Sequence, residues 1–155
     1  MSEYYADIEW RLEPSEDFAS GKYSRGHLWH FDGGTTVPGS ASPHVVPVPW
    51  SLEENVDPEE AFVASLSSCH MLWFLHLARD GGFVVESYVD KAVGVMAKNA
   101  EGKLAMTIVT LKPEVGFSAG AAASAAELDA LHHAAHEECF IANSVKTEVR
   151  IESSS

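Results

Sequence analysis

The chain has 155 residues, of which 46% are hydrophobic, so its length suits one globular domain that buries its own core without crosslinks. Its 23 acidic residues outnumber the 10 basic ones, and the formal net charge of −13 argues against a nucleic-acid partner. Residues 1–10 contain no apolar run, and the longest strongly apolar run, residues 71–75, is too short to cross a bilayer. We therefore expect a cytoplasmic protein, with a single domain over residues 1–155, that has neither a membrane nor a nucleic acid as its partner.

The N-terminal third predicts strands followed by a long irregular segment. Residues 4–12 and 26–31 interleave aromatic and β-branched residues with polar ones, which predicts two strands of a hairpin or meander, and residues 32–34 supply a turn. Residues 35–56 contain four prolines together with apolar residues, so we expect an ordered loop. The apolar run in this loop could line a pocket for an alkyl chain, or its valines could pack onto the sheet.

A helix is predicted to begin at Asp57. Asp57 is a favourable N-cap, Pro58 suits the first helical position, and Glu60 stands three residues after the cap, as in a capping box. Residues 61–78 are apolar nearly all round, broken only by serines, one cysteine and two histidines. We expect this helix to run to Arg79 and to be buried on most sides.

The following segments predict further strands. Residues 84–97 and 103–117 are rich in Val, Ile, Leu and Met and should form a long β-hairpin around a turn at residues 99–102. Near the end of the chain, residues 144–152 alternate between apolar and charged side chains. That alternation predicts a final strand with one buried face.

A second helix is predicted between the hairpin and the final strand. Ser124 and Glu127 form a capping box, an apolar stripe follows, and the helix should end near Cys139. The resulting order, β-β-loop-α-β-β-α-β, predicts an α+β fold with an antiparallel-rich sheet and a central helix.

Cys69, in the first predicted helix, and Cys139, at the end of the second, are the two cysteines of the chain. A cytoplasmic domain of this size does not need a disulfide for stability, so we interpret the pair as a thiol-dependent site. Free cysteine is also among the most often buried residue types, and composition alone leaves a packing role equally open.

The segment DPEEAFVASLSSC, residues 57–69, resembles the signature of the OsmC/organic hydroperoxide resistance (Ohr) family. In that signature an Asn/Asp-Pro-Glu start leads to a helical cysteine ten positions after the Glu, as Cys69 follows Glu59 here. Tyr23-Ser24-Arg25-Gly26, the order of elements and the position of Cys139 match as well. The resemblance implies an OsmC-like α+β fold with antiparallel-rich sheets, a long buried central helix, a second helix and an intertwined homodimer.

The resemblance also implies a peroxidase that reduces organic hydroperoxides without a metal or an organic cofactor. Cys69 would be the peroxidatic residue and Cys139 the resolving one. Arg25 would stabilise the Cys69 thiolate, whose pKa burial alone would raise, and Glu59 would hold the guanidinium. The sulfenic acid formed on Cys69 would condense with Cys139, and an external dithiol, of the dihydrolipoamide type by analogy, would reduce the disulfide.

The spacing between Glu59 and Cys69 bears on the assembly. Ten residues of straight helix span roughly 15 Å, which is beyond direct contact. If both residues serve one site, either the chain bends early or Glu59 acts in a partner subunit, and the second option predicts a twofold dimer.

Two features depart from the family pattern. Phe140 follows Cys139 where members usually have proline, and residues 37–50 differ from the short glycine-rich segment of the better-known peroxidases. These two departures leave open the alternative that the chain is an OsmC-like protein without peroxidase activity, which binds a metal or another small ligand. Arg11 and Arg79 are alternatives to Arg25.

A metal site is the rival interpretation. His132, His136 and Cys139 fall at positions i, i+4 and i+7 of one helix face, and His70 adjoins Cys69, so a zinc or copper site can be drawn. An exposed histidine-rich helix face is the simpler alternative, because the chain has eight histidines and lacks CxxC and HExxH motifs.

Overall fold

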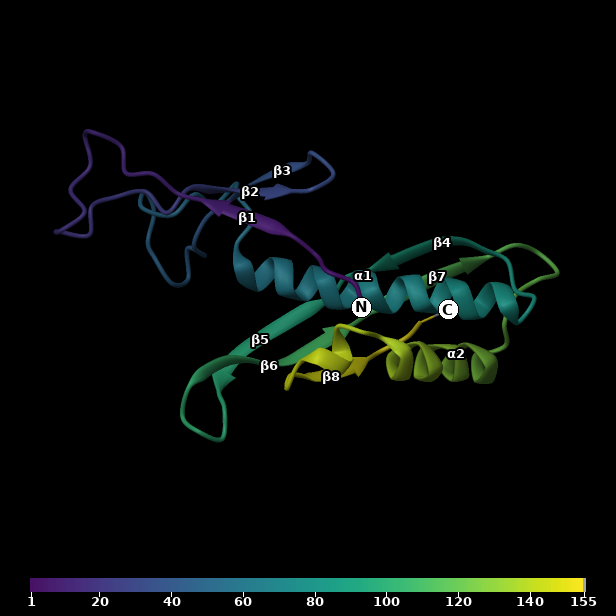
Figure 1. Ribbon diagram of the computed structural model, residues 1–155. Coiled ribbons are helices and arrows are strands. Elements are labelled where there is room, and N and C mark those ends of the chain that lie inside the picture. The colour runs from purple at the N-terminus through teal and green to yellow at the C-terminus, as the bar shows by residue number, and fades with distance from the viewer. Residues whose placement is uncertain (155) are drawn as a thin grey trace. The chain divides into compact units, whose positions relative to one another are not determined.

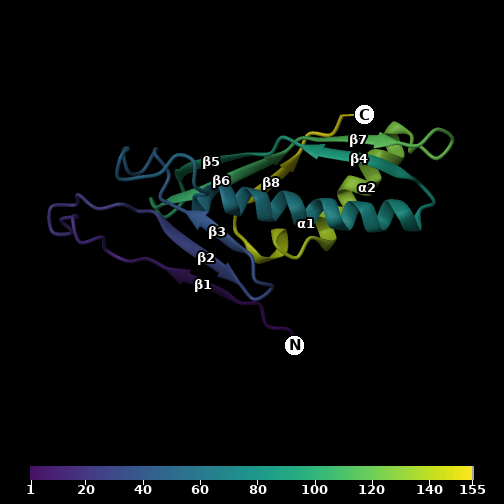
Figure 2. The ribbon, with the colours of Figure 1, turned by 90° about the horizontal axis from the view of Figure 1, so that it is seen from above.

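The computed structural model describes residues 1–154 (Figures 1 and 2). The chain clusters into two compact units, Met1–Ala61 and Phe62–Ser155, and the boundary between them falls inside the long helix α1 (Pro58–Asp80).

The first unit contains a three-stranded antiparallel sheet in the order β1-β2-β3, formed by β1 (Ala6–Glu9), β2 (His27–Phe31) and β3 (Thr36–Gly39). The two predicted strands and the turn at residues 32–34 are confirmed, but β3 lies in the segment expected to be a loop. Pro38 is tolerated there because β3 is an edge strand of the sheet. Proline has no N–H group, and at an edge position no neighbouring strand needs that group as a hydrogen-bond donor. The Pro38 carbonyl instead accepts a hydrogen bond from the Val56 N–H at 3.0 Å.

Helix α1 begins where the sequence predicts. The Asp57 carboxylate accepts a hydrogen bond from the Glu60 N–H at 2.8 Å, and the Glu60 carboxylate accepts one from the Asp57 N–H at 3.1 Å. This reciprocal capping box satisfies two of the N–H groups at the helix start that lack an intrahelical partner.

One face of α1 is fully buried in the single chain. Leu66, His70, Phe74 and Ala78, spaced by four residues, form the buried stripe, whereas Leu72 is 61% exposed. Burial on most sides was expected, but the strands of the second unit lie along one side of the helix (Figure 2). Among the described residues α1 is the one helix whose length and apolar composition would also suit a membrane span, a property it shares with the core helices of many proteins.

The second unit contains two small sheets. Their strands are β4 (Val85–Asp90), β5 (Val93–Lys98), β6 (Leu104–Leu111), β7 (Pro113–Phe117) and β8 (Glu148–Ile151). β4 pairs with β7, and the other sheet has the order β5-β6-β8. The predicted long hairpin is thus confirmed, but each of its two arms is interrupted once, between β4 and β5 and between β6 and β7. Where the arms are interrupted, the Asp90 carboxylate accepts a hydrogen bond from the Lys112 N–H at 2.6 Å. β8 runs parallel to β6.

Helix α2 (Ala125–Glu138) has the predicted capping box between Ser124 and Glu127 and is followed by a short 3₁₀ helix, η1 (Ala142–Ser144). It packs against α1 in an apolar cluster formed by Phe74, Ala78, Val115, Leu128 and Ala135. A second cluster, formed by Leu66, Val109 and Leu111, joins α1 to β6. The middle of α1 and the end of α2 are thereby held against rigid elements.

Candidate thiol site

Both cysteines are free thiols of the second unit, and the Cys69 side chain is close enough to hydrogen-bond Cys139. Cys69 stands in the middle of α1 and is half-buried, whereas Cys139 is the C-cap of α2 and is only 1% exposed. The Cys139 Sγ accepts a hydrogen bond from the Ala142 N–H at 3.4 Å. The backbone turn after α2 therefore fixes the Cys139 sulfur.

The surroundings of Cys139 favour its protonated form. Burial raises the pKa of the Cys139 thiol to about 11, and hydrogen bonding to the Cys69 side chain adds to the rise, while the Ala142 N–H acts in the opposite direction. The contribution from Cys69 places the two thiols within interaction range. Cys139 is therefore a buried thiol beside a more accessible one.

Aromatic side chains cover this end of α2. The Trp73 ring packs edge-on against Phe140 with ring centroids 5.4 Å apart. Phe140, which stands where the family usually has proline, is 66% exposed. Its ring thus links α1 to the segment that carries Cys139.

A pair of histidines lies in the core between the two helices. The His70 Nε2 and the His132 Nδ1 are 3.0 Å apart, and the two rings are stacked at 8°. Burial lowers the pKa of each histidine to about 4. Sequence reasoning had considered these histidines as metal ligands, with an exposed histidine-rich helix face as the simpler alternative. Both His70 and His132 are instead buried among apolar residues of their helices, a pattern that predicts a buried imidazole in need of a partner.

The metal interpretation finds no support in the described part of the chain. Within residues 1–154 no group of three or more His, Cys, Asp or Glu side chains is arranged to hold a metal ion. The triplet His132, His136 and Cys139 shares a helix face, as predicted, but His132 is bonded to His70.

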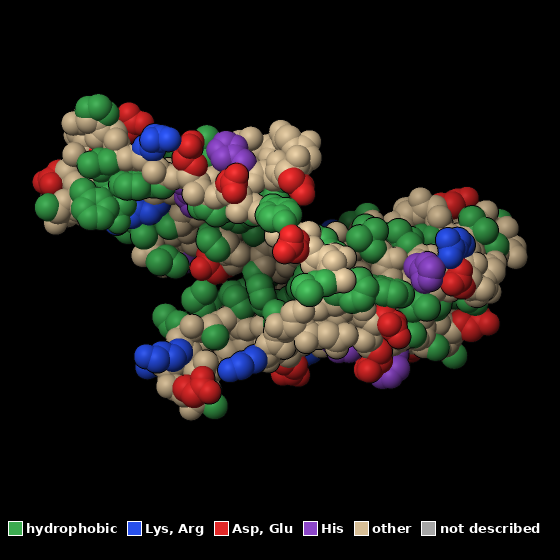
Figure 3. Space-filling model, viewed as in Figure 1, with side chains coloured by type: hydrophobic (Ala, Val, Ile, Leu, Met, Phe, Trp, Pro, Cys, Tyr) green, Lys and Arg blue, Asp and Glu red, His purple; other side chains and the backbone are tan. Residues whose placement is uncertain are grey.

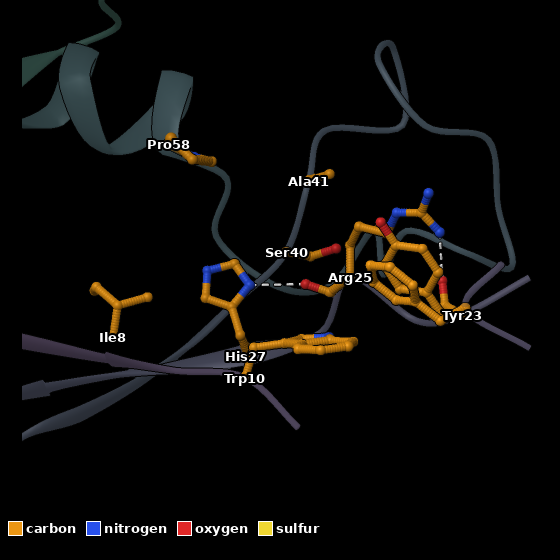
Figure 4. A pocket seen from close by; sticks show the side chains of 9 residues that line it. Ile8, Trp10, Tyr23, Arg25, His27, Ser40, Ala41 and Pro58 are labelled. Carbon is orange, nitrogen blue, oxygen red and sulfur yellow. Dashed lines mark hydrogen bonds between the residues drawn. The ribbon is translucent and has the colours of Figure 1, made fainter. Parts of the chain in front are cut away.

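Arg25 belongs to the first unit and is held by its own neighbourhood. Its guanidinium lies 3.6 Å from the centroid of the Tyr23 ring and donates to the Gly21 carbonyl at 2.9 Å and to the Tyr23 carbonyl (Figure 4). Arg11 and Arg79, the alternatives to Arg25, have exposed side chains paired with surface carboxylates. Of the three, Arg25 is the half-buried one.

Arg25 also lines an apolar cavity of about 420 Å³ in the first unit. The cavity is walled by Ile8, Trp10, Phe18, Tyr23, Arg25, His27, Ser40, Ala41 and Pro58 (Figure 4). The proline-rich loop contributes only Ser40 and Ala41, and Val45 and Val48 of that loop are exposed. These two valines therefore neither line the cavity nor pack onto the sheet.

Glu59 lies in the first turn of α1. No ion pair among residues 1–154 joins it to Arg25, so the predicted contact is not made within this chain. Because α1 runs unbroken from Pro58 to Asp80, the early bend that would bring Glu59 to Cys69 does not occur. The option of a partner subunit stays a prediction.

Fold and cysteines together define an α+β protein with a dithiol site, and comparisons with known proteins identify the class. The model of the family described as OsmC-like protein matches residues 52–154. The structure of an OsmC-like protein of unknown function from Vibrio cholerae is 55% identical, with a TM-score of 0.98 over 99% of this chain and 100% of that one. The chain therefore belongs to the OsmC-like family, which confirms the resemblance seen in the sequence.

More distant structures share the fold. An organic hydroperoxide resistance protein from Elizabethkingia anophelis is 15% identical, with a TM-score of 0.74 over 100% of this chain and 97% of that one. OhrB of Bacillus subtilis, also an organic hydroperoxide resistance protein, is 17% identical, with a TM-score of 0.69 over 97% and 98%. The search of curated proteins gave no match.

Proposed function

We propose that this protein is a thiol-dependent peroxidase that reduces organic hydroperoxides through Cys69 and Cys139. The observation that carries the proposal is the pairing of a half-buried free thiol on α1 with a buried free thiol at the end of α2. The distant structures named for organic hydroperoxide resistance support the same reading.

The unequal environments of the two thiols support unequal roles for them in the proposed reaction. Cys69 is accessible enough to meet a peroxide, and its thiolate attacks one peroxide oxygen, which breaks the O–O bond and leaves an alcohol and a Cys69 sulfenic acid. Cys139 is shielded from solvent and protonated, so it is protected from the peroxide itself. Its sulfur then attacks the Cys69 sulfenic sulfur, forming the disulfide and releasing water.

Further parts of the proposal rest on the family resemblance. Arg25 would stabilise the Cys69 thiolate, and Glu59 would hold that arginine from a partner subunit of a homodimer, since the two do not pair within one chain. An external dithiol of the dihydrolipoamide type would reduce the disulfide, and no metal or organic cofactor takes part. The site of action would be the cytoplasm.

The test is to titrate the reduced protein with cumene hydroperoxide and to follow free thiols and intact mass. We expect both thiols to be lost and the mass to fall by about 2 Da, because a disulfide has two hydrogens fewer than two thiols. Cys69→Ser should abolish peroxide consumption, and Cys139→Ser should leave a sulfenic acid that dimedone traps. Thiols that stay unreacted with several alkyl hydroperoxides would refute the proposal.

The apolar cavity favours a second candidate, an OsmC-like protein that binds a small ligand without reacting with it. The cavity carries aromatic walls and one half-buried cation, which suits an apolar molecule with an anionic group. Quenching of tryptophan fluorescence by such a molecule, together with unreactive thiols, would favour this function over the peroxidase.

A further inference from the structure

The second unit contains a row of histidines that the proposed reaction does not yet use. His132 and His136 stand one turn apart on α2, and Cys139 follows at i+7 on the same face. His132 is bonded to His70 of α1, so the row consists of His136 and a pair of imidazoles in the core.

The bond between His70 and His132 has a chemical consequence. A neutral imidazole carries one N–H and one bare nitrogen. If the His70 Nε2 donates, the His132 Nδ1 is bare and both rings are protonated at Nε2; if the His132 Nδ1 donates, both are protonated at Nδ1. The pair can therefore accept a proton at one outer nitrogen and release one at the other by exchanging these two states.

The outer nitrogens of the row are unpaired. The His70 Nδ1, the His132 Nε2 and the His136 Nδ1 are buried and have no hydrogen-bond partner among residues 1–154. Leaving a buried polar atom without a partner is unfavourable, so three such atoms in one row point to a functional reason.

The surroundings give the row a direction. His136 is close enough to His70 to lower the pKa of His70. Asp129 of α2 and Asp90 of β4 act on His132 and raise its pKa, although burial prevails. The Tyr88 hydroxyl of β4 is buried near His132 and has no hydrogen-bond partner within residues 1–154. The row thus leads from the C-terminal end of α2, where Cys139 lies, toward two carboxylates.

Cys139 has to lose a proton in order to resolve the sulfenic acid. Because burial raises the pKa of the Cys139 thiol to about 11, this thiol is almost entirely protonated at pH 7. A general base beside it would raise the rate of that step by about 10²–10⁴-fold. His136, three residues before Cys139 on the same helix face, is placed for this role.

We propose that His136 accepts the Cys139 proton as the disulfide forms and that the His70–His132 pair carries a proton onward toward Asp90 and Asp129. This inference rests on the proposed peroxidase function. As the S–S bond forms, the S–O bond of the Cys69 sulfenic acid breaks. The departing hydroxide takes a proton from solvent to become water, and the row returns the Cys139 proton to solvent. Atoms and electrons therefore balance, and no further reagent is needed.

The experiment is a single turnover with cumene hydroperoxide, in which sulfenic acid and disulfide are quantified separately by dimedone trapping and thiol titration. His136→Gln and His132→Gln should slow disulfide formation at pH 7 by about tenfold or more and let trapped sulfenic acid accumulate, while sulfenic acid forms at the normal rate. His133→Gln, at an exposed position beside His132, is the matched control and should behave as the wild type.

The pH profile separates this role from a packing role. Without the base, the rate of disulfide formation in His136→Gln should rise about tenfold per pH unit as the thiolate fraction grows, whereas the wild-type rate should change less. Wild-type protein that forms no sulfenic acid would refute the peroxidase function, and with it the proposed proton relay through His136, His70 and His132. Normal sulfenic acid formation followed by equal disulfide rates in His136→Gln and His133→Gln would overturn the relay alone.

A ¹⁵N NMR spectrum of the wild-type imidazoles tests the His70–His132 pair without any substitution. Matching tautomers for His70 and His132 are expected, and unlike tautomers would overturn the relay.

Discussion

At the scale of single residues, the most consequential feature is that histidines occupy core positions of both helices. His70 continues the buried stripe of α1, and His132 lies beside Leu128 and Ala135 on α2. The His132 ring stacks on Phe74 at a centroid distance of 4.4 Å, so an imidazole takes the place of an apolar side chain in the packing. Neutral imidazoles suit this setting, and charged ones do not.

This setting predicts how stability depends on pH. The unfolded chain binds protons on these histidines below about pH 6.5, whereas burial lowers the pKa of both in the folded state to about 4. Well above pH 6.5 these histidines are neutral in both states and do not change the free energy of unfolding, which should fall by about 3 kcal/mol for each histidine as the pH drops from 6.5 through 4.

Urea unfolding at several pH values measures this loss. His132→Phe should reduce the loss, and the exposed His133→Gln should leave it unchanged. Asp80, Glu127 and Glu148, whose carboxyl pKa values are lowered in the folded state, add their own loss at acid pH, but equally in all variants. An equal pH dependence in His132→Phe and the wild type would contradict the prediction.

At the scale of elements, the hairpin of β2 and β3 depends on one glycine. The Trp29 indole N–H donates to the His27 Nε2 at 2.7 Å, and the His27 Nδ1 lies 2.7 Å from the Arg25 carbonyl. The His27 ring is therefore neutral and held at both nitrogens, and it fixes the backbone of Arg25 beside the cavity. Gly39, paired with His27 across the strands, leaves room for this arrangement.

Gly39→Ala should destabilise the first unit. A Cβ at position 39 would lie 2.5 Å from the Trp29 Nε1 and 2.7 Å from the His27 Nε2, so the bond between these rings has to break or the strands have to separate. We expect a loss of about 1–3 kcal/mol, as for other overpacked sites, measured by thermal unfolding followed through tryptophan fluorescence. Gly33→Ala is the control, because nothing lies within 4 Å of its Cβ, and equal stability of the two variants would count against this role of Gly39.

At the scale of the whole molecule, the single chain leaves large apolar side chains in water. Leu72 of α1 is 61% exposed, Phe140 is 66% exposed and Leu104 is 70% exposed, and Figure 3 shows hydrophobic side chains on the viewed face of both units. Exposed apolar surface of this kind is typical of a protein–protein interface, which agrees with the proposed homodimer.

The dimer gives a prediction at this scale. Sedimentation equilibrium at micromolar concentration should give about twice the chain mass of 16.8 kDa. Leu72→Glu places a charge on the exposed face of α1 and should shift the protein toward monomers, with a parallel loss of peroxidase activity if Glu59 acts from the partner. A wild-type monomer with full activity would rule out the role assigned to Glu59.

Much of the fold was predictable from local signals. The two capping boxes set the starts of α1 and α2, the turn at residues 99–102 placed the long hairpin, and alternation identified β8, because each of these signals acts over a few residues. β3 was missed because an edge strand accommodates proline. The division of the long hairpin was also missed, although Pro113 directly follows the break between β6 and β7.

The site follows the same division. By itself the sequence determined the family, the α+β class and the positions of Cys69 and Cys139 on two helices, since a short motif and helix-end signals are written locally. Only the tertiary structure decided that the two thiols are neighbours, that Arg25 contacts Tyr23 and not Glu59, and that His132 bonds His70 in place of a metal. The contacts between Cys69 and Cys139 and between His70 and His132 join residues far apart in the sequence, and packing, which no local pattern encodes, brings them together.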